Sequence, residues 1–295
     1  MKEKELIQII KSTLNSEYIG DDCAYLKDLG IVISQDSLVE DVHFSLDYTT
    51  PYQLGWKSAA VNISDICASG AKPKYLTISL SLPNKVNESF VKEFYQGAKS
   101  VSNDVEIVGG DITGSDKIYI SVCAIGSDKN RKISSRSNAK VGYKVIVSGE
   151  HGNSAESLKL LQKGILTPEK FVRAHLMPVP QIDFSEYLAK NADFDYAMMD
   201  TSDGLADALI QIANSSGVAI KIDTSKIPHD TSLNMETVLY GGEDYGLVAA
   251  IPSEFACSYP VIGEVIAGAG LIIDGQKFVN IDNKLYNHFE EKNEN

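Results

Sequence analysis

A short acidic turn in the second half of the chain carries residue types that suit phosphate and metal chemistry. Asp200 and Asp203 flank a hydroxyl, that of Ser202. An apolar run over residues 196–199 predicts the end of a buried strand, and a helical pattern begins at residue 205. Such a turn presents backbone N–H groups and the positive end of the helix dipole to an anion. Because the carboxylates would repel a bare phosphate, the turn predicts a divalent cation between carboxylate and phosphate.

Further acids decide whether this turn is more than a helix cap, since Ser202 or Asp203 alone could simply cap the helix. Other carboxylates occupy turns, strand ends or apolar surroundings: Asp22, Asp36, Asp65, Asp111 and Glu243. If they converge with Asp200, they form a site for several hard cations, with water and phosphate oxygens completing the coordination. A site of this kind favours phosphoryl transfer by charge neutralisation and alignment.

Asp65 lies in the middle of a predicted helix that starts after the cap Thr50 and ends near residue 68. The second half of this helix is almost entirely small or apolar, so the helix should be buried. A buried, unpaired carboxylate is costly, and Asp65 therefore needs a cation, a hydrogen-bond donor or a bound proton. A hydrogen bond to neighbouring backbone is the structural alternative; the polar neighbours Asn62 and Ser64 favour a metal.

Composition limits the classes of partner. The chain has 295 residues, 43% of them hydrophobic, so it can form a sizeable core. Its net charge of −13 argues against a surface that binds nucleic acids or membranes. The four cysteines are widely spaced, which predicts neither a zinc cluster nor disulfides and fits a cytoplasmic protein. The N-terminal pattern predicts an amphipathic helix over residues 3–15, neither a signal peptide nor a membrane span.

Strand and helix patterns alternate along both halves and predict an α/β (α+β) protein of two domains. The basic connector over residues 127–143 separates them, and we place the boundary so that the domains cover residues 1–133 and 134–295. A strand over residues 105–108 is expected to end in a glycine-rich turn that contains Asp111. A second glycine-and-acid turn, around Glu243, is expected before a strand over residues 247–251.

The common nucleotide-binding signatures are absent: there is no phosphate-binding loop with GxxxxGK, no kinase glycine loop, and no GxGxxG after a strand. An ATP site in this chain must therefore belong to another fold. A calcium-binding or structural protein stays open from the acidic turns alone, although the D-x-D-x-D-G loop is missing.

Six short motifs occur in a fixed order and resemble the thiamine-monophosphate kinase family. This family belongs to a superfamily with aminoimidazole ribonucleotide synthetase, selenophosphate synthetase and hydrogenase maturation protein E. The motifs are GDDCA (20–24), SQDSLV (34–39), VNISD (61–65), GGDIT (109–113), DTSDGL (200–205) and GGEDY (241–245). The resemblance spans nearly the whole chain.

The resemblance implies an aminoimidazole ribonucleotide synthetase-like fold. In it, the N-terminal domains of a homodimer pair into a barrel-like sheet, and the C-terminal domain is an α/β sandwich. ATP would lie in a cleft near the dimer interface and, with several Mg²⁺ ions, would phosphorylate thiamine phosphate to thiamine diphosphate. Nucleic acids and membranes are not expected partners.

The resemblance also implies the roles of individual residues. The implied metal ligands are Asp22, Ser34, Asp36, Asp65, Asp111, Asp200 and Asp203. The implied ATP contacts are Gly110, Asp111, Arg136 and Ser202. Those to thiamine phosphate are His43, Glu243 and Tyr286. The basic connector independently suggests that one arginine reaches a phosphate.

Two other functions stay open on the sequence. One is a different ATP-dependent enzyme of the superfamily, of the selenophosphate synthetase or hydrogenase-maturation type, because Cys23 lies close to the N-terminal glycine turn. The other is a catalytically silent nucleotide-binding protein.

Overall fold

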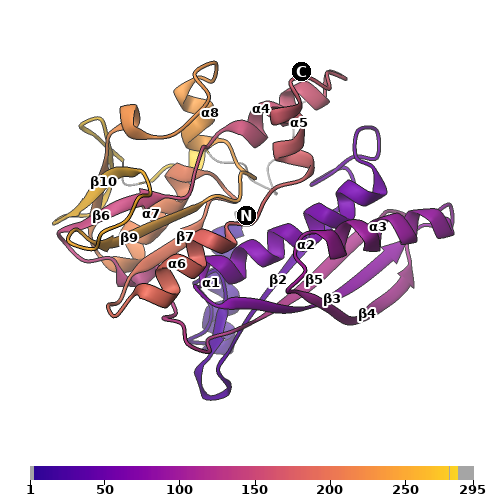
Figure 1. Ribbon diagram of the computed structural model, residues 1–295, viewed down its shortest axis with the longest axis horizontal. Helices are drawn as coiled ribbons and strands as arrows, with labels where there is room; N and C mark the ends of the chain where they lie inside the picture. Colours follow the sequence, from indigo (N-terminus) through magenta and orange to yellow (C-terminus); the bar gives the residue numbers. More distant parts are fainter. Residues whose placement is uncertain (1–2, 279, 285–295) are drawn as a thin grey trace.

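The computed structural model describes residues 3–278 and 280–284, and it contains two β-sheets built from consecutive parts of the chain (Figure 1). The first sheet has five strands in the order β1-β2-β5-β3-β4. Its strands are β1 (Ala24–Leu26), β2 (Ile31–Val39), β3 (Lys72–Leu82), β4 (Glu106–Gly114) and β5 (Tyr119–Ser127). The helices of this half are α1 (Glu3–Leu14), α2 (Pro51–Ala68) and α3 (Glu88–Ser100).

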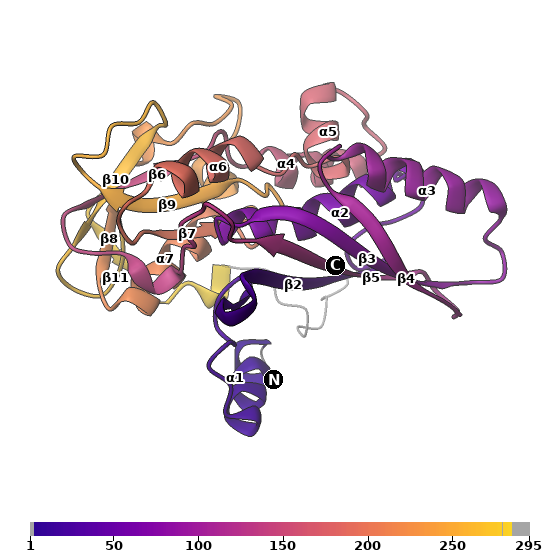
Figure 2. The ribbon, with the colours of Figure 1, turned by 60° about the horizontal axis from the view of Figure 1, so that its bottom comes forward.

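One face of the five-stranded sheet is covered by α2 and α3, whereas α1 projects away from the opposite side (Figure 2). The alternation of β3 fits this arrangement: Leu76, Ile78 and Leu80 are buried beneath the helices, while Tyr75 is exposed on the other face. The predicted cap of α2 is present, because the side chain of Thr50 accepts a hydrogen bond from the backbone of Gln53 in a capping box.

The second sheet has seven strands in the order β12-β11-β8-β10-β6-β9-β7, and all pairs except β11–β8 are antiparallel. Its strands are β6 (Tyr143–Val147), β7 (Ala197–Asp200), β8 (Ala219–Ile222), β9 (Leu247–Pro252), β10 (Val261–Ile266), β11 (Gly270–Ile273) and β12 (Gln276–Phe278). Its helices are α4 (Asn153–Leu161), α5 (Glu169–Leu176), α6 (Ile182–Asn191), α7 (Leu205–Ser216) and α8 (Met235–Tyr240).

The strand that leads to the acidic turn, β7, is buried on both faces. Met198 packs in the core that contains α2 and α6, whereas Ala197 and Met199 pack in a second core with α7. This double burial explains why the strand reads as a continuous apolar run. It also fixes Asp200, the last residue of β7, at the junction of the two halves.

The prediction of a glycine-rich turn over residues 109–114 is wrong. These residues continue β4 as far as Gly114, paired in parallel with β3. A register shift between Leu76 and Thr77 lets the strand run on through the two glycines. The boundary proposed between residues 133 and 134 falls in the segment between β5 and β6. Helix α8 was not predicted.

Within the described residues, no helix is long and apolar enough to cross a membrane.

Two glycines let α2 and α3 cross closely, and this crossing holds the helix that carries Asp65. A Cβ added at Gly97 would lie 1.9 Å from the backbone oxygen of Tyr52, and one at Gly55 would lie 1.8 Å from that of Phe94. We therefore expect Gly97→Ala to lower the free energy of unfolding by about 2–3 kcal/mol, although alanine is the better helix former. Urea denaturation measures this. Gly149→Ala, whose Cβ meets nothing within 4 Å, is the control, and equal stability of the two variants would contradict the prediction.

Candidate functional site

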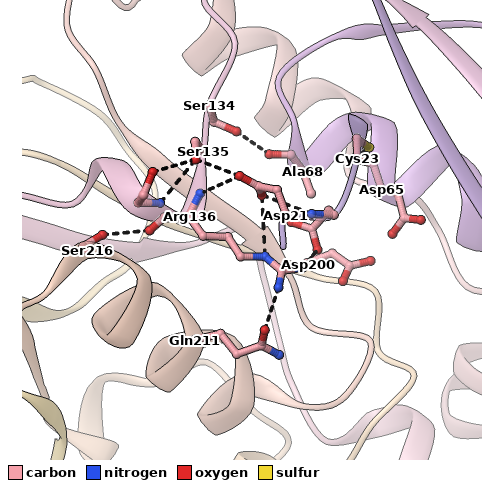
Figure 3. A network of polar contacts seen from close by, with 12 residues as sticks. Asp21, Cys23, Asp65, Ala68, Ser134, Ser135, Arg136, Asp200, Gln211 and Ser216 are labelled. Atoms are coloured by element: carbon pink, nitrogen blue, oxygen red, sulfur yellow. Dashed lines mark hydrogen bonds and ion pairs between the residues drawn. The ribbon is translucent and has the colours of Figure 1, made fainter. Parts of the chain in front are cut away.

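Three aspartates that are distant in the sequence meet at the junction of the two sheets. Asp22 precedes β1, Asp65 lies in α2 and Asp200 ends β7. One carboxylate oxygen from each lies within 4.8 Å of the others, and Figure 3 shows the side chains of Asp65 and Asp200 on the same side of the network. The predicted convergence is thus confirmed for these three acids; their role as metal ligands stays a prediction.

Serine hydroxyls orient two of the three carboxylates. Ser34 on β2 donates a hydrogen bond to Asp65, and Ser64 on α2 donates one of 2.8 Å to Asp200. The hydroxyl of Ser202 donates a second hydrogen bond to Asp200, also 2.8 Å long. Because the donors come from both halves of the chain, the arrangement of the carboxylates depends on how the halves pack. Ser34, an implied ligand, lies directly beside the cluster.

The implied ATP contact Arg136 binds the same cluster from the connector. Its guanidinium lies 2.6 Å from Asp22 and 2.6 Å from the amide oxygen of Gln211. Asp21 holds the connector in place, since it accepts hydrogen bonds from the hydroxyl of Ser135 and from the backbone N–H of Arg136. Figure 3 shows the guanidinium between Asp21 and Gln211. The basic segment therefore does bring one arginine to the acids.

The cluster carries more negative charge than its surroundings compensate. Burial raises the pKa of Asp22 to about 7, although Arg136 opposes the shift. Burial also raises the pKa values of Asp65 and Asp200, and the neighbouring Asp36 adds to the shift at Asp65. One buried oxygen of Asp22, Oδ2, has no hydrogen-bond partner among the described residues. Buried carboxylates that one arginine compensates only in part are unfavourable in a site without a cation. Carboxylate oxygens, including the Asp22 oxygen described above, are the ligands that a hard divalent cation prefers, so the cluster fits such a cation.

A cleft of about 510 Å³ opens beside this cluster, between the two halves. Asp36 and Asp65 line it from the first half, and Ser202 and Asp203 from the second. Asp203 is exposed on its rim. The backbone N–H of Asp36 donates to the side chain of Asn62, which links β2 to α2. The cleft thus contains three further predicted acids or hydroxyls next to the cluster.

Two implied substrate contacts, His43 and Glu243, also line this cleft. The ring of His43 accepts a hydrogen bond from the backbone of Val39, which ties it to the end of β2. Glu243 adopts a left-handed backbone conformation, with φ of 64°, and its backbone N–H donates to the carbonyl of Ser202. Its turn is therefore packed directly on the DTSDG turn.

The remaining acid of this turn, Asp244, has a structural role. Its carboxylate accepts hydrogen bonds from the backbone N–H groups of Gly152 and Ser154 at the start of α4. These bonds satisfy N–H groups that a helix leaves open at its N-terminus. They also fix the position of Glu243 relative to the cleft.

The structure does not bring Asp111 into this cluster within one chain. Its strand, β4, is the edge strand farthest from β1 and β2. The paired rows place Asp111 beside Ser79, Ser121 and Ser37, on the open face, whereas Asp36 is in the neighbouring row that faces the helices. Asp36 and Asp111 are thus separated by three strand spacings, roughly 14 Å. Gly110 lies on the same edge strand, and Tyr286 lies outside the described residues.

Sequence reasoning missed several polar residues around the site. Asp21, Ser135 and Gln211 fix Arg136; Asp21 lies in the GDDCA motif but was given no role, and nothing in the local pattern marks the role of Ser135 or Gln211. Lys57 is buried behind the cleft and the buried His175 lines it, and for Lys57 a signal existed. Lys57 lies in the same apolar helix as Asp65, so the argument that a buried charge needs a partner applied to it as well.

Comparisons with known proteins agree with this geometry. Residues 20–127 match the family model described as AIR synthase related protein, N-terminal domain. The chain is 37% identical to the thiamine-monophosphate kinase of Aquifex aeolicus, over 96% of this chain and 97% of that protein. It is 33% identical to that of Bacillus subtilis, over 92% of this chain and 93% of that protein.

A solved structure of a protein named AaThiL, in complex with AMPPCP and TMP, superposes on this chain with a TM-score of 0.88. The two chains are 36% identical, and the match covers 98% of this chain and 97% of that one. The match includes both sheets and therefore the junction at which the carboxylates meet. By its sequence and its fold, the chain belongs to the thiamine-monophosphate kinase family.

Proposed function

We propose that this chain transfers the γ-phosphoryl group of ATP to thiamine phosphate and so forms thiamine diphosphate. The observation that carries the proposal is the convergence of Asp22, Asp65 and Asp200 beside a cleft large enough for a substrate. Membership of the kinase family gives the reaction, and the solved relative bound to an ATP analogue supports ATP as co-substrate. A supply of ATP and thiamine phosphate favours a cytoplasmic location.

In this proposal, the aspartates of the cluster and its cleft hold several Mg²⁺ ions: Asp22, Asp36, Asp65, Asp200 and Asp203, with Ser34 beside them. The bound cations supply charge neutralisation, so that two phosphorylated molecules can approach. The attacking oxygen belongs to a phosphate that is ionised at neutral pH, and no side chain has to act as a strong base. The work of the protein is alignment.

The side chains around the cluster have separate tasks. Arg136 offers charge-assisted hydrogen bonds to phosphate oxygens of ATP. Ser202, in the turn before α7, lines the cleft, and its hydroxyl can contact the nucleotide once it turns from Asp200. His43 and Glu243 line the cleft next to the cluster, where Glu243 can pair with the cationic ring of thiamine phosphate. Tyr286 is proposed to stack on that ring.

The edges of the first sheet favour a homodimer. Strand β1 pairs only with residues 31–33 of β2, so among the described residues no strand lies beside the outer edge of β2 from Ser34 onward. At the other edge, β4 exposes Val108 and Ile112. Unpaired edges with apolar side chains favour pairing with another chain. We propose that β4 of one subunit joins β2 of the other into the barrel-like sheet, which would bring Gly110 and Asp111 toward the partner's site.

The selenophosphate synthetase alternative is not favoured. That chemistry would draw on a reactive thiol, but burial raises the pKa of the Cys23 thiol well above its ordinary value, and the nearby carboxylates add to the shift. The thiol donates a hydrogen bond to the backbone carbonyl of Asp65 instead. A protonated, hydrogen-bonded thiol is a poor nucleophile.

Asp65→Asn tests the catalytic role of the cluster. We expect kcat to fall at least about a hundredfold, because loss of one electrostatic stabiliser typically costs 10²–10³. The variant should stay folded, since it removes a buried charge. A coupled assay with thiamine phosphate and magnesium ATP measures the turnover, and Asp104→Asn, an exposed carboxylate paired with Lys72, is the control. Full activity of Asp65→Asn would refute its role.

The raised pKa of Asp22 gives a pH dependence in metal-free buffer. Between 3.8 and about 7 the native state binds more protons at this group than the unfolded state, so its contribution to stability is lost as the pH rises through that window. We expect the free energy of unfolding of the wild type to fall by up to a few kcal/mol relative to Asp22→Asn. Urea titrations in EDTA from pH 4 to 8 measure this. At pH 7.5, added Mg²⁺ should restore the stability that the wild type loses in EDTA. Parallel pH curves for the two proteins would contradict the assignment.

Subunit complementation tests the proposed dimer. Asp111→Asn and Asp65→Asn should each be inactive alone. If Asp111 acts in the partner's site, mixed and reassociated subunits regain about a quarter of wild-type activity, because half of the dimers are mixed and each has one intact site. Light scattering checks that the mixture is dimeric. Failure of a dimeric mixture to recover activity would place Asp111 outside the partner's site.

A further inference from the structure

A lysine is buried directly behind the cleft. Lys57 of α2 has a side chain that is only 1% exposed, and it does not line the cleft itself. Its ammonium group lies 3.0 Å from Glu243 Oε1, 3.2 Å from the backbone carbonyl oxygen of His43 and 3.3 Å from His175 Nε2. These three contacts match the three N–H groups of a lysine. Every proton of the ammonium therefore has an acceptor.

His175 completes the contact with Glu243. Burial, together with the Lys57 ammonium, lowers its pKa to about 4 although Glu243 opposes the shift, so the ring is neutral near pH 7. Its Nε2 then accepts from Lys57, and its Nδ1–H faces Glu243 Oε2 at 3.2 Å and the hydroxyl of Ser154 at 3.1 Å. Burial alone would raise the pKa of Glu243, but Lys57, His175 and His43 together outweigh burial, with Lys57 contributing most, and hold that pKa below its ordinary value. The carboxylate is thus ionised, with both oxygens held.

The contacts of Lys57 connect the two walls of the cleft. His43 comes from the segment after β2 in the first half, whereas Glu243 comes from the turn before β9 in the second. A single ammonium group touches both, and both line the cleft, whereas Lys57 does not. A shift of this ammonium would move the carboxylate and the histidine segment together.

We propose that Lys57 is a positioning residue for the thiamine phosphate pocket. Lys57 holds Glu243 and the His43 segment at the spacing that admits the cationic ring. This inference rests on the proposed function, because it takes the cleft to be the substrate pocket. It adds a residue that the six motifs do not include. Lys57 acts through Glu243 and His43 and touches no reacting atom.

A general stabilising role does not explain this placement. A buried ion pair contributes little net stability compared with apolar residues of the same volume, because both charges must be desolvated. The chain contains a second buried cation for comparison: Arg131, 2% exposed, pairs with Glu186 on α6 at 2.9 Å. Its guanidinium also faces the carbonyl of Gly70, just after α2. It thus links the same two halves, but neither partner lines the cleft.

Lys57→Met tests the inference, with Arg131→Met as the matched control. We expect the Kd and KM for thiamine phosphate to rise at least about tenfold in Lys57→Met, because a small misplacement of binding groups is enough for such a loss. The Kd for magnesium AMPPCP and the value of kcat should change less than about threefold. Arg131→Met should leave all of these values near those of the wild type. Calorimetry measures binding independently of turnover.

A double-mutant cycle separates positioning from general stability. If Lys57 acts through Glu243, Lys57→Met lowers thiamine phosphate affinity much less in the Glu243→Gln background than in the wild type, and only the part that passes through the His43 segment is left. If Lys57→Met does not fold, Lys57→Gln takes its place, because glutamine keeps hydrogen-bonding capacity without the charge. The same tenfold rise in the Kd for thiamine phosphate is expected for it. Unchanged affinity in a folded Lys57 variant, or fully additive effects, would overturn the inference. A wild type that binds AMPPCP but not thiamine phosphate would instead overturn the proposed function.

Discussion

The structure depends on the burial of three like charges where its two halves meet. Asp22, Asp65 and Asp200 come from different elements, and each leaves water only because the two sheets pack against each other. Without a cation, this arrangement is unfavourable, as the raised pKa values show. Natural proteins keep such unfavourable charge at sites where function requires it. The site therefore exists at the expense of the stability of the metal-free protein.

Helix α2 connects this charge to the rest of the fold. It packs on the five-stranded sheet through its apolar face and shares a core with Met198 of β7. The same helix carries Asp65 toward the cluster and Lys57 toward the other end of the cleft, eight residues or about two turns away. Because both charged groups belong to one rigid element, their separation is fixed. The close crossing with α3 at Gly55 and Gly97 holds that element in place.

The sequence predicted the local parts of the site better than the distant ones. The apolar run before Asp200, the cap at Thr50 and the acid in the apolar helix are patterns within a few residues, and the structure confirms the strand, the cap and the helix. The course of residues 109–114 was wrong, because pairing with β3 overrides the preference of two glycines for a turn. That pairing places Asp111 on a far edge, which no local pattern records. Partners such as Gln211 for Arg136 arise only from tertiary packing.

The order of charges along the cleft matches the order of charges in the proposed substrate. At one end lies the aspartate cluster, which in the proposed function holds cations and binds phosphate through them. Elsewhere in the cleft, Glu243 is ionised, and its contacts with Lys57 and His175 orient both carboxylate oxygens. In the proposed function, an incoming cationic ring meets a carboxylate that is already ionised and oriented. The site then rejects neutral analogues, because they cannot compensate the charge of this carboxylate. A molecule with a cationic ring and a terminal phosphate satisfies both ends at once. A simple phosphate satisfies only the first, so the spacing that α2 imposes between the two ends becomes the basis of selectivity.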